Sequence, residues 1–326
     1  MPDQVSARKH FSRRNAVTAL GVMSTWVVAS GATCISRTRP SDLYAPPIVF
    51  ESEPSLDELI GQLNNSLNIQ SIESNTLKVS SPDISFRLNG SMVWQRQMNF
   101  YFEARPPGGN VLPTAIAAGS TDEKFWAKLS YPREQLVYAR YAEFESLMGP
   151  RPLLPVSPIW IREAMGIIEF DPQHKHTGLQ RRPNGWVEIE SHIPSPRGGY
   201  IRKVVVDPKL ATIHQTTLTE ASTRRMIASA DMSKHTYFGE VGVALPMEVH
   251  VKLLGRETLS FTVEISNYLF NQTTAESDAR YEMPDSTGID TVDLTRVLAN
   301  GQFTPASTPK YTPERTATLP GHYSVR

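Results

Sequence analysis

The sequence pattern with the most potential for metal chemistry is DPQHKH, which places Asp171, His174 and His176 close together. Two histidines two residues apart on a strand point to the same side, where they could ligate a divalent metal together with a carboxylate. Proline and charged residues surround this pattern and favour a loop. We therefore expect solvated loop histidines and no metal site.

The chain also lacks the short motifs of common catalytic sites. It contains no GxSxG, P-loop, GxGxxG or HExxH pattern. Cys34 is its single cysteine, so the rest of the chain offers no thiol nucleophile and no cysteine metal cluster. The sequence predicts that the chain is not an enzyme and binds no cofactor. The weaker alternative is a hydrolase whose carboxylates come from separate parts of the sequence. Four further histidines are expected on polar strand faces: His192, His214, His235 and His250.

Cys34 directly follows an uncharged, largely apolar stretch, residues 15–33, which four basic residues precede. A basic start, an apolar centre and small residues near the end are typical of a secretory signal peptide. A membrane-spanning helix is the alternative, but the stretch is short and polar residues such as Thr18 and Ser24 dilute it. We expect residues 1–33 to be a signal peptide.

The position of Cys34 resembles the lipoprotein box of bacterial lipoproteins, whose cysteine thiol receives a diacylglycerol before the peptide is cut in front of it. Gly31 and Thr33 depart from that box, which leaves ordinary cleavage near Ser30 as the alternative. A cysteine without a disulfide partner in an exported chain needs another role, so we expect lipid attachment at Cys34. Both general export and twin-arginine export, suggested by SRRN at residues 12–15, stay open.

Charge and length set limits on the partners. Without residues 1–33 the chain has 29 basic and 32 acidic residues, a net charge of −3. That balance provides no basic excess for nucleic acid, and no Lys/Arg block marks a membrane-surface patch. About 290 residues can bury one large core or two smaller ones. We therefore expect no nucleic-acid partner.

Composition divides the mature chain into three parts. Residues 34–53 are polar and contain prolines, as expected of a flexible tether behind a lipid anchor. Residues 54–300 carry the periodic patterns of a folded domain. A proline-rich insertion at 146–170, with a short helical pattern near 159–166, interrupts them and is expected to pack over the sheet. Residues 301–326 are rich in Pro and Thr and predict a disordered tail.

The folded part begins with a helix and continues with strands. Ser55 and Glu58 have capping-box spacing, and Leu56, Ile60 and Leu63 fall on one side of that helix. Afterwards the apolar period changes to two. We predict a mainly β fold, with one large antiparallel sheet curled into an incomplete, half-open barrel with covering helices. The alternating stretches cover residues 84–94, 98–105, 124–130, 134–141, 185–192, 199–207, 211–219, 224–232, 245–253 and 258–270.

Apolar side chains alternate on many of these strands, so the sheet has an apolar face. In a wide or open barrel such a face lines a cavity, whereas in a small closed barrel it is a packed core. Burial of hydrocarbon is worth about 0.8 kcal/mol per methylene, which makes an acyl chain the ligand that such a cavity favours. The candidate lining residues are Phe100, Phe102, Trp126, Val249, Val251, Phe261 and Val263.

The order of several motifs resembles the outer-membrane lipoprotein carrier and receptor group (LolA/LolB-like). Trp126 after Phe125 is the closest local match, and the likeness covers about residues 55–285. PIWIREAMGI at residues 158–167 also resembles exported, planctomycete-type relatives. After the apolar helix, the motifs are LNGSMVWQRQMNFYFEARP at 88–106, AGSTDEKFWAKLS at 118–130 and EQLVYARY at 134–141.

This resemblance implies an incomplete antiparallel barrel with helices over a concave apolar face, and it implies acyl chains of lipids or lipoproteins as ligands. An anchor at Cys34 implies more likeness to the membrane-bound receptor than to the soluble carrier. The longer chain, the insertion and the tail depart from the group, so the carrier role itself does not follow. No ligand residue is carried over, because no motif fixes one.

Three functions remain in competition. The first is an exported, lipid-anchored envelope protein that binds acyl chains or lipoproteins at the periplasmic face of the outer membrane. The second is an envelope structural or interaction lipoprotein without a lipid ligand. The third is an envelope enzyme, which needs a polar cluster such as Asp171, His174 and His176. Ile35 favours the outer membrane, since an Asp in that place retains some lipoproteins in the inner one.

Overall fold

The structure is a computed structural model of the chain. All residues that it describes belong to one compact unit, Tyr44–Arg326. The predicted signal peptide, Cys34 and the tail predicted for 301–326 lie outside the described residues, as does most of the tether. The structure describes residues 45–96, 98–108, 114–130, 133–147, 152, 154–256, 258–272 and 278–296.

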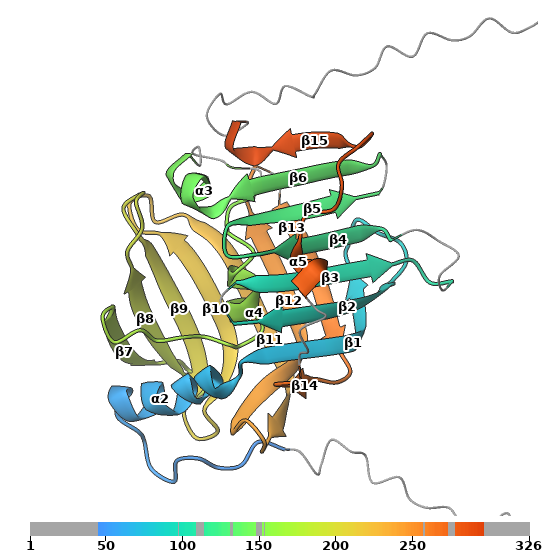
Figure 1. The fold of residues 1–326 in the computed structure, drawn as a ribbon. Coiled ribbons are helices and arrows are strands. Elements are labelled where there is room, and N and C mark those ends of the chain that lie inside the picture. The colour runs from blue at the N-terminus through green and yellow to red at the C-terminus, as the bar shows by residue number, and fades with distance from the viewer. Residues whose placement is uncertain are drawn as a thin grey trace, which may run out of the picture. The chain divides into compact units, whose positions relative to one another are not determined.

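A single 15-stranded sheet dominates the fold (Figure 1). Its strands lie in the order β15-β6-β5-β4-β3-β2-β1-β13-β12-β11-β10-β9-β8-β7, and β14 pairs with β1. Neighbours are antiparallel except for β15, which is parallel to β6. In the described part of the chain the edge strands β15 and β7 do not pair with each other, so the sheet stays open. The prediction of a mainly β fold with one large, mostly antiparallel, unclosed sheet is confirmed.

In chain order the strands are β1 (Ser71–Ser80), β2 (Leu88–Gln95), β3 (Asn99–Arg105), β4 (Ile116–Ser120), β5 (Lys124–Leu129), β6 (Gln135–Arg140), β7 (Lys175–Arg181), β8 (Val187–Ile193), β9 (Tyr200–Asp207), β10 (Thr212–Glu220), β11 (Met226–Phe238), β12 (Val243–Leu254), β13 (Thr258–Ile265), β14 (Leu269–Phe270) and β15 (Asp290–Asp293). The helices are α2 (Leu56–Leu63), the 3-10 helix η2 (Asn64–Asn68), α3 (Tyr141–Leu147), α4 (Trp160–Ala164) and α5 (Asp278–Tyr281). The prediction lacked β1, β4, β7 and β15.

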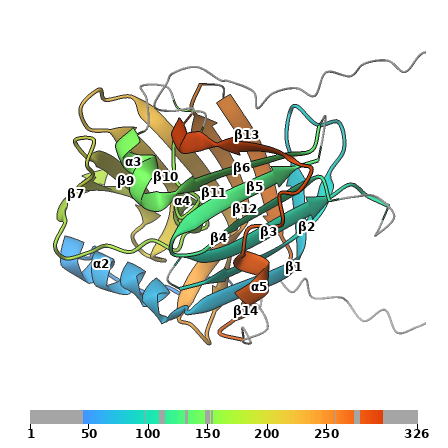
Figure 2. The same ribbon diagram turned by 45° about the horizontal axis from the view of Figure 1, so that its top comes forward.

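The chain path divides the sheet into two halves. Strands β1 to β6 follow one another as neighbours toward one edge. The chain then crosses to the opposite edge and returns through β7 to β13, which pairs with β1. The crossing carries α3 and α4, and Figures 1 and 2 both show α4 between the two halves. Residues 154–170 of the proline-rich stretch therefore pack over the sheet.

Helix α2 begins at the predicted capping box. The Ser55 hydroxyl accepts a hydrogen bond from the Glu58 N–H at 3.3 Å, and the Glu58 carboxylate accepts one from the Ser55 N–H at 2.8 Å. Leu63 is buried as predicted, but the fully buried Leu59 was missing from the predicted apolar side. Among the described residues, no helix has the length and apolarity needed to cross a bilayer.

The end of the predicted tether belongs to the fold. The backbone N–H groups of Val49 and Phe50 donate to the Lys209 carbonyl at 2.8 and 3.2 Å, and Glu53 pairs with Arg181. Phe50 also packs, half-buried, against the core. The boundary at residue 53 was therefore placed too late, because an apolar side chain and backbone hydrogen bonds before it dock on the sheet.

The core lies on the inner face of the sheet, defined as the face that carries Phe100 and that α4 covers. Residues 154–170, called the covering segment below, pack against both halves of this face. Trp160 and Ile168 join a cluster with strands β8 to β12, whereas Met165 and Ile167 join a cluster with β1 to β3. One short segment therefore fills the space between the two halves.

Candidate functional site

Six of the seven predicted lining residues share the inner face. The pairing of β12 with β13 places Val249 opposite Val263 and Val251 opposite Phe261. Phe102, from the other half of the sheet, packs in the same cluster as Phe261 and Val263. The apolar surface therefore continues across both halves. The six residues are Phe100, Phe102, Val249, Val251, Phe261 and Val263.

Trp126 is the exception and corrects the prediction. It lies opposite Gly119, which in turn lies opposite Tyr101, so its ring is on the outer face of the sheet. A Cβ on Gly119 would lie 2.6 Å from this ring, so only glycine leaves room for it. The Trp126 indole N–H donates to the Tyr281 carbonyl at 2.9 Å. Phe125 points inward instead, since only one of two adjacent strand residues can face each side.

Trp126 and Tyr101 line a surface hollow of about 470 Å³ on this outer face. Charged side chains border it, including Lys128 and Glu134, which pair at 2.7 Å. Trp126 itself is only 4% exposed. The hollow mixes charged and apolar groups, so the more apolar inner face is the stronger candidate for an acyl chain.

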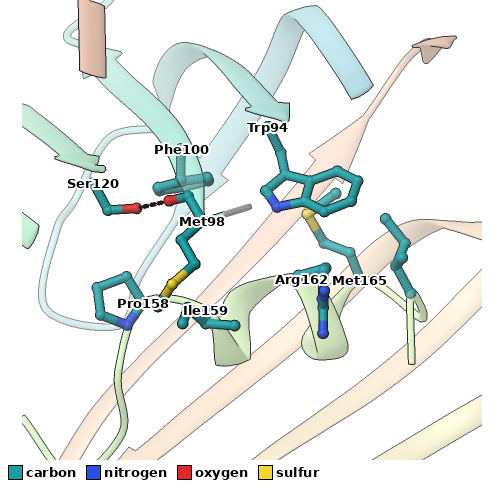
Figure 3. A pocket seen from close by; sticks show the side chains of 9 residues that line it. Trp94, Met98, Phe100, Ser120, Pro158, Ile159, Arg162 and Met165 are labelled. Atoms are coloured by element: carbon teal, nitrogen blue, oxygen red, sulfur yellow. Dashed lines mark hydrogen bonds between the residues drawn. The ribbon is translucent and has the colours of Figure 1, made fainter. Parts of the chain in front are cut away.

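The inner face is covered and filled in this structure. The space between it and the covering segment measures about 10 Å³ (Figure 3). That volume is at the limit for a single water, whereas ligand pockets typically measure about 300–1,000 Å³. Of the two alternatives, cavity or packed core, the structure therefore shows the packed core. The lining residues of this space are Trp94, Met98, Phe100, Ser120, Pro158, Ile159, Arg162, Met165 and Ile167.

A buried ion pair holds the covering segment to the sheet. Arg202 of β9 donates to the Glu163 carboxylate of α4 at 3.1 Å and to the Glu169 carbonyl at 2.8 Å. The two charged side chains are only 3% and 15% exposed. The Arg202 guanidinium also lies 5.0 Å from the centre of the Phe170 ring, a cation–π distance.

The same interface leaves buried polar atoms without hydrogen-bond partners among the described residues. They are Trp160 Nε1, Arg162 Nε, Glu163 Oε2 and Arg202 Nε. Each such atom costs about 1–3 kcal/mol when water is removed from it. Apolar contact, the Arg202–Glu163 ion pair and hydrogen bonds to the carbonyls of residues 168–170 hold the covering segment, and the partnerless atoms oppose closure. Arg162 and Glu163, adjacent charges within the apolar stretch WIREAM at residues 160–165, were a sequence signal for the interface between the covering segment and the sheet. The prediction did not use this signal.

The cluster of Asp171, His174 and His176 is only in part the solvated loop that was predicted, because Asp171 and His174 lie in a turn that leads into β7. His176 lies on β7, where its Nδ1 is 2.9 Å from the Ser191 hydroxyl and its Nε2 is 2.8 Å from the Asp171 carbonyl. The His174 ring lies 3.8 Å from the Asp171 carboxylate. Ser191 is fully buried, so its hydroxyl is out of reach of a substrate. Within the described residues these side chains form no group that could hold a metal.

His235 provides a prediction about acid stability. Burial, with a smaller contribution from the neighbouring His214, lowers the pKa of His235 from 6.5 to about 4. The unfolded chain therefore binds a proton more readily, and stability is lost as the pH falls from about 6.5 through about 4. We expect a loss of about 3 kcal/mol from this group. Urea unfolding of the His235→Gln variant across that range should show a correspondingly flatter pH dependence, and an unchanged dependence would contradict the assignment.

Comparison with known proteins gives low-identity matches to solved structures. No family model matches the chain, and no curated protein matches it. It is similar to a LolA superfamily protein from Nitrosomonas europaea, with 10% identity, a TM-score of 0.45, and coverage of 69% of this chain and 97% of that one. It is also similar to a putative outer membrane lipoprotein-sorting protein domain from Vibrio parahaemolyticus, with 11% identity, a TM-score of 0.44, and coverage of 67% of this chain and 94% of that one. A third similar structure is a DUF1329 family protein from Desulfovibrio piger, with 12% identity, a TM-score of 0.43, and coverage of 69% of this chain and 95% of that one. The function therefore has to come from this chain's own side chains.

Proposed function

We propose that this chain is an exported, lipid-anchored envelope protein whose inner face binds acyl chains when the covering segment moves aside. The observation that carries the proposal is the inner face itself. Two halves of an open sheet present a continuous apolar surface, and one segment of the same chain covers it. The sequence resemblance of residues 55–285 to lipoprotein carriers and receptors points in the same direction.

Burial of an acyl chain would offset part of the free energy that is lost when the covering segment leaves the inner face. Transfer of about 14 methylenes from water to an apolar surface is worth about 11 kcal/mol, at about 0.8 kcal/mol each. Exposure of Trp160, Met165 and Ile167 costs about 1.5–3 kcal/mol for each side chain. Rehydration of the partnerless polar atoms offsets part of that cost.

The test is acyl uptake by the full chain after delipidation, measured by native mass spectrometry with added palmitate. We expect saturable binding that denaturation abolishes. A bare protein mass at every palmitate concentration would contradict the proposal.

The anchor is a separate part of the proposal and is tested separately. We propose that Cys34 carries the lipid and that the protein sits at the periplasmic face of the outer membrane. Labelled palmitate should enter the chain during growth, and Cys34→Ala should abolish the label while the chain is still exported. Equal labelling of both chains would contradict lipid attachment at Cys34.

The filled inner face favours a second candidate, an envelope structural or interaction lipoprotein without a lipid ligand. In that function the covering segment stays in place. A stable protein partner of a chain that takes up no palmitate would support it.

A further inference from the structure

Arg162 is the single charged residue among the nine that line the space beneath the covering segment. Seven of the others are apolar, and the Ser120 hydroxyl donates to the Met98 carbonyl (Figure 3). The guanidinium of Arg162 lies 5.8 Å from the centre of the Trp94 ring. The charge therefore sits against an apolar surface.

The neighbouring arginines make hydrogen bonds through their side chains, although Arg202 Nε has no partner, and Arg162 differs from them. Arg96 donates to the Ile69 and Leu67 carbonyls at 3.2 and 2.8 Å. Arg202 pairs with Glu163, as described above. Among the described residues, no hydrogen bond or ion pair engages the Arg162 side chain, and its Nε is buried.

The buried Arg162 Nε has no acceptor among the described residues, which destabilises the closed state. Burial lowers the pKa of Arg162, although a guanidinium stays charged in proteins. Its nearest acidic neighbour along α4, Glu163, is already bound by Arg202. An anion that reached the guanidinium would form charge-assisted hydrogen bonds where none exist now.

We propose that Arg162 binds the anionic head of the acyl ligand, so that the site selects single-chain acyl anions over neutral acyl esters. The inference rests on the proposed function and specifies its ligand class. A carboxylate and a phosphate monoester both fit, because a guanidinium binds either one with paired N–H donors. The hydrocarbon chain would lie along Trp94, Met165 and Ile167, which line the same space.

The test compares three probes on the delipidated full chain: palmitate, a lysophosphatidate with the same acyl chain, and methyl palmitate. We expect the two anions to bind about tenfold or more tightly than methyl palmitate, as one charge-assisted pair predicts. The Arg162→Gln variant should lose that advantage and keep its affinity for methyl palmitate. The stronger of the two anions identifies the head group.

The control variant is Arg87→Gln, because Arg87 is 63% exposed and pairs with Glu264 at the surface. It should bind all three probes like the unaltered chain. Arg162→Gln should melt close to the unaltered chain, since no hydrogen bond or ion pair engages the Arg162 side chain among the described residues and its Nε is buried without an acceptor. Equal binding of all probes, unaffected by Arg162→Gln, would overturn this inference and leave the proposed function standing. Binding of none of the probes would overturn the proposed function itself.

Discussion

Replacement of Trp160 by alanine is expected to lower the free energy of unfolding by about 3–5 kcal/mol and to tighten palmitate binding by about tenfold or more. Trp160 is 5% exposed and packs between the covering segment and the sheet. Its loss removes buried contact from the closed state and empties space on the inner face. Because binding requires the segment to move, a weaker closed state raises the fraction of chains that can bind. Denaturant unfolding and palmitate titration measure the two effects.

Trp126→Ala is the matched control for this prediction. Trp126 is equally buried, at 4% exposed, but it lies on the outer face. Its truncation should cost a similar 3–5 kcal/mol and leave palmitate affinity unchanged. Equal tightening by both variants would mean that general loosening of the fold, rather than release of the covering segment, controls binding.

Replacement of Arg202 by methionine is expected to destabilise the fold by about 3–5 kcal/mol, because it leaves the Glu163 carboxylate buried without its partner. Methionine keeps most of the apolar stem that packs in this region. The double replacement Arg202→Met, Glu163→Met should recover most of the loss, since it removes both charges together. Denaturant unfolding of the two variants measures the difference.

Arg140→Met is the control for that experiment. Arg140 pairs with Glu143 at the surface, where the two side chains are 61% and 46% exposed. Exposed pairs contribute about 0–1 kcal/mol, so this variant should unfold almost like the unaltered chain. If Arg202→Met behaved like Arg140→Met, the buried pair would not hold the covering segment.

Local patterns were sufficient to predict much of the fold. The capping box at Ser55 marked the start of α2, and strict alternation around Val263 marked an inner face on β13. At Phe125 and Trp126 two aromatic residues are adjacent, and alternation alone does not say which one faces inward. Gly119 on the neighbouring strand indicates that Trp126 faces outward, because it leaves room for the Trp126 ring on the outer face.

Other features depend on contacts that no local pattern encodes. Asp290–Asp293 forms β15 only because it pairs in parallel with β6, which lies more than 100 residues earlier in the chain. Lys175–Arg181 is exposed and charged, so β7 has no alternating apolar signal. The pair of Arg202 and Glu163 joins β9 to α4. The filled inner face follows from the same long-range packing, whereas the sequence favoured a packed core and left a cavity open as the alternative.

The proposed function requires that acyl chains bind on the inner face after the covering segment moves. The most direct measurement is photolabelling of the full chain with a palmitate analogue that carries a diazirine at the end of its hydrocarbon chain, followed by mapping of the labelled peptides. Labels are expected on β3, β12 and β13 at inner-face positions such as Phe102, Val251 and Phe261, and unlabelled palmitate should compete them away. Labels confined to the outer face around Trp126, or labels that palmitate does not displace, would contradict it.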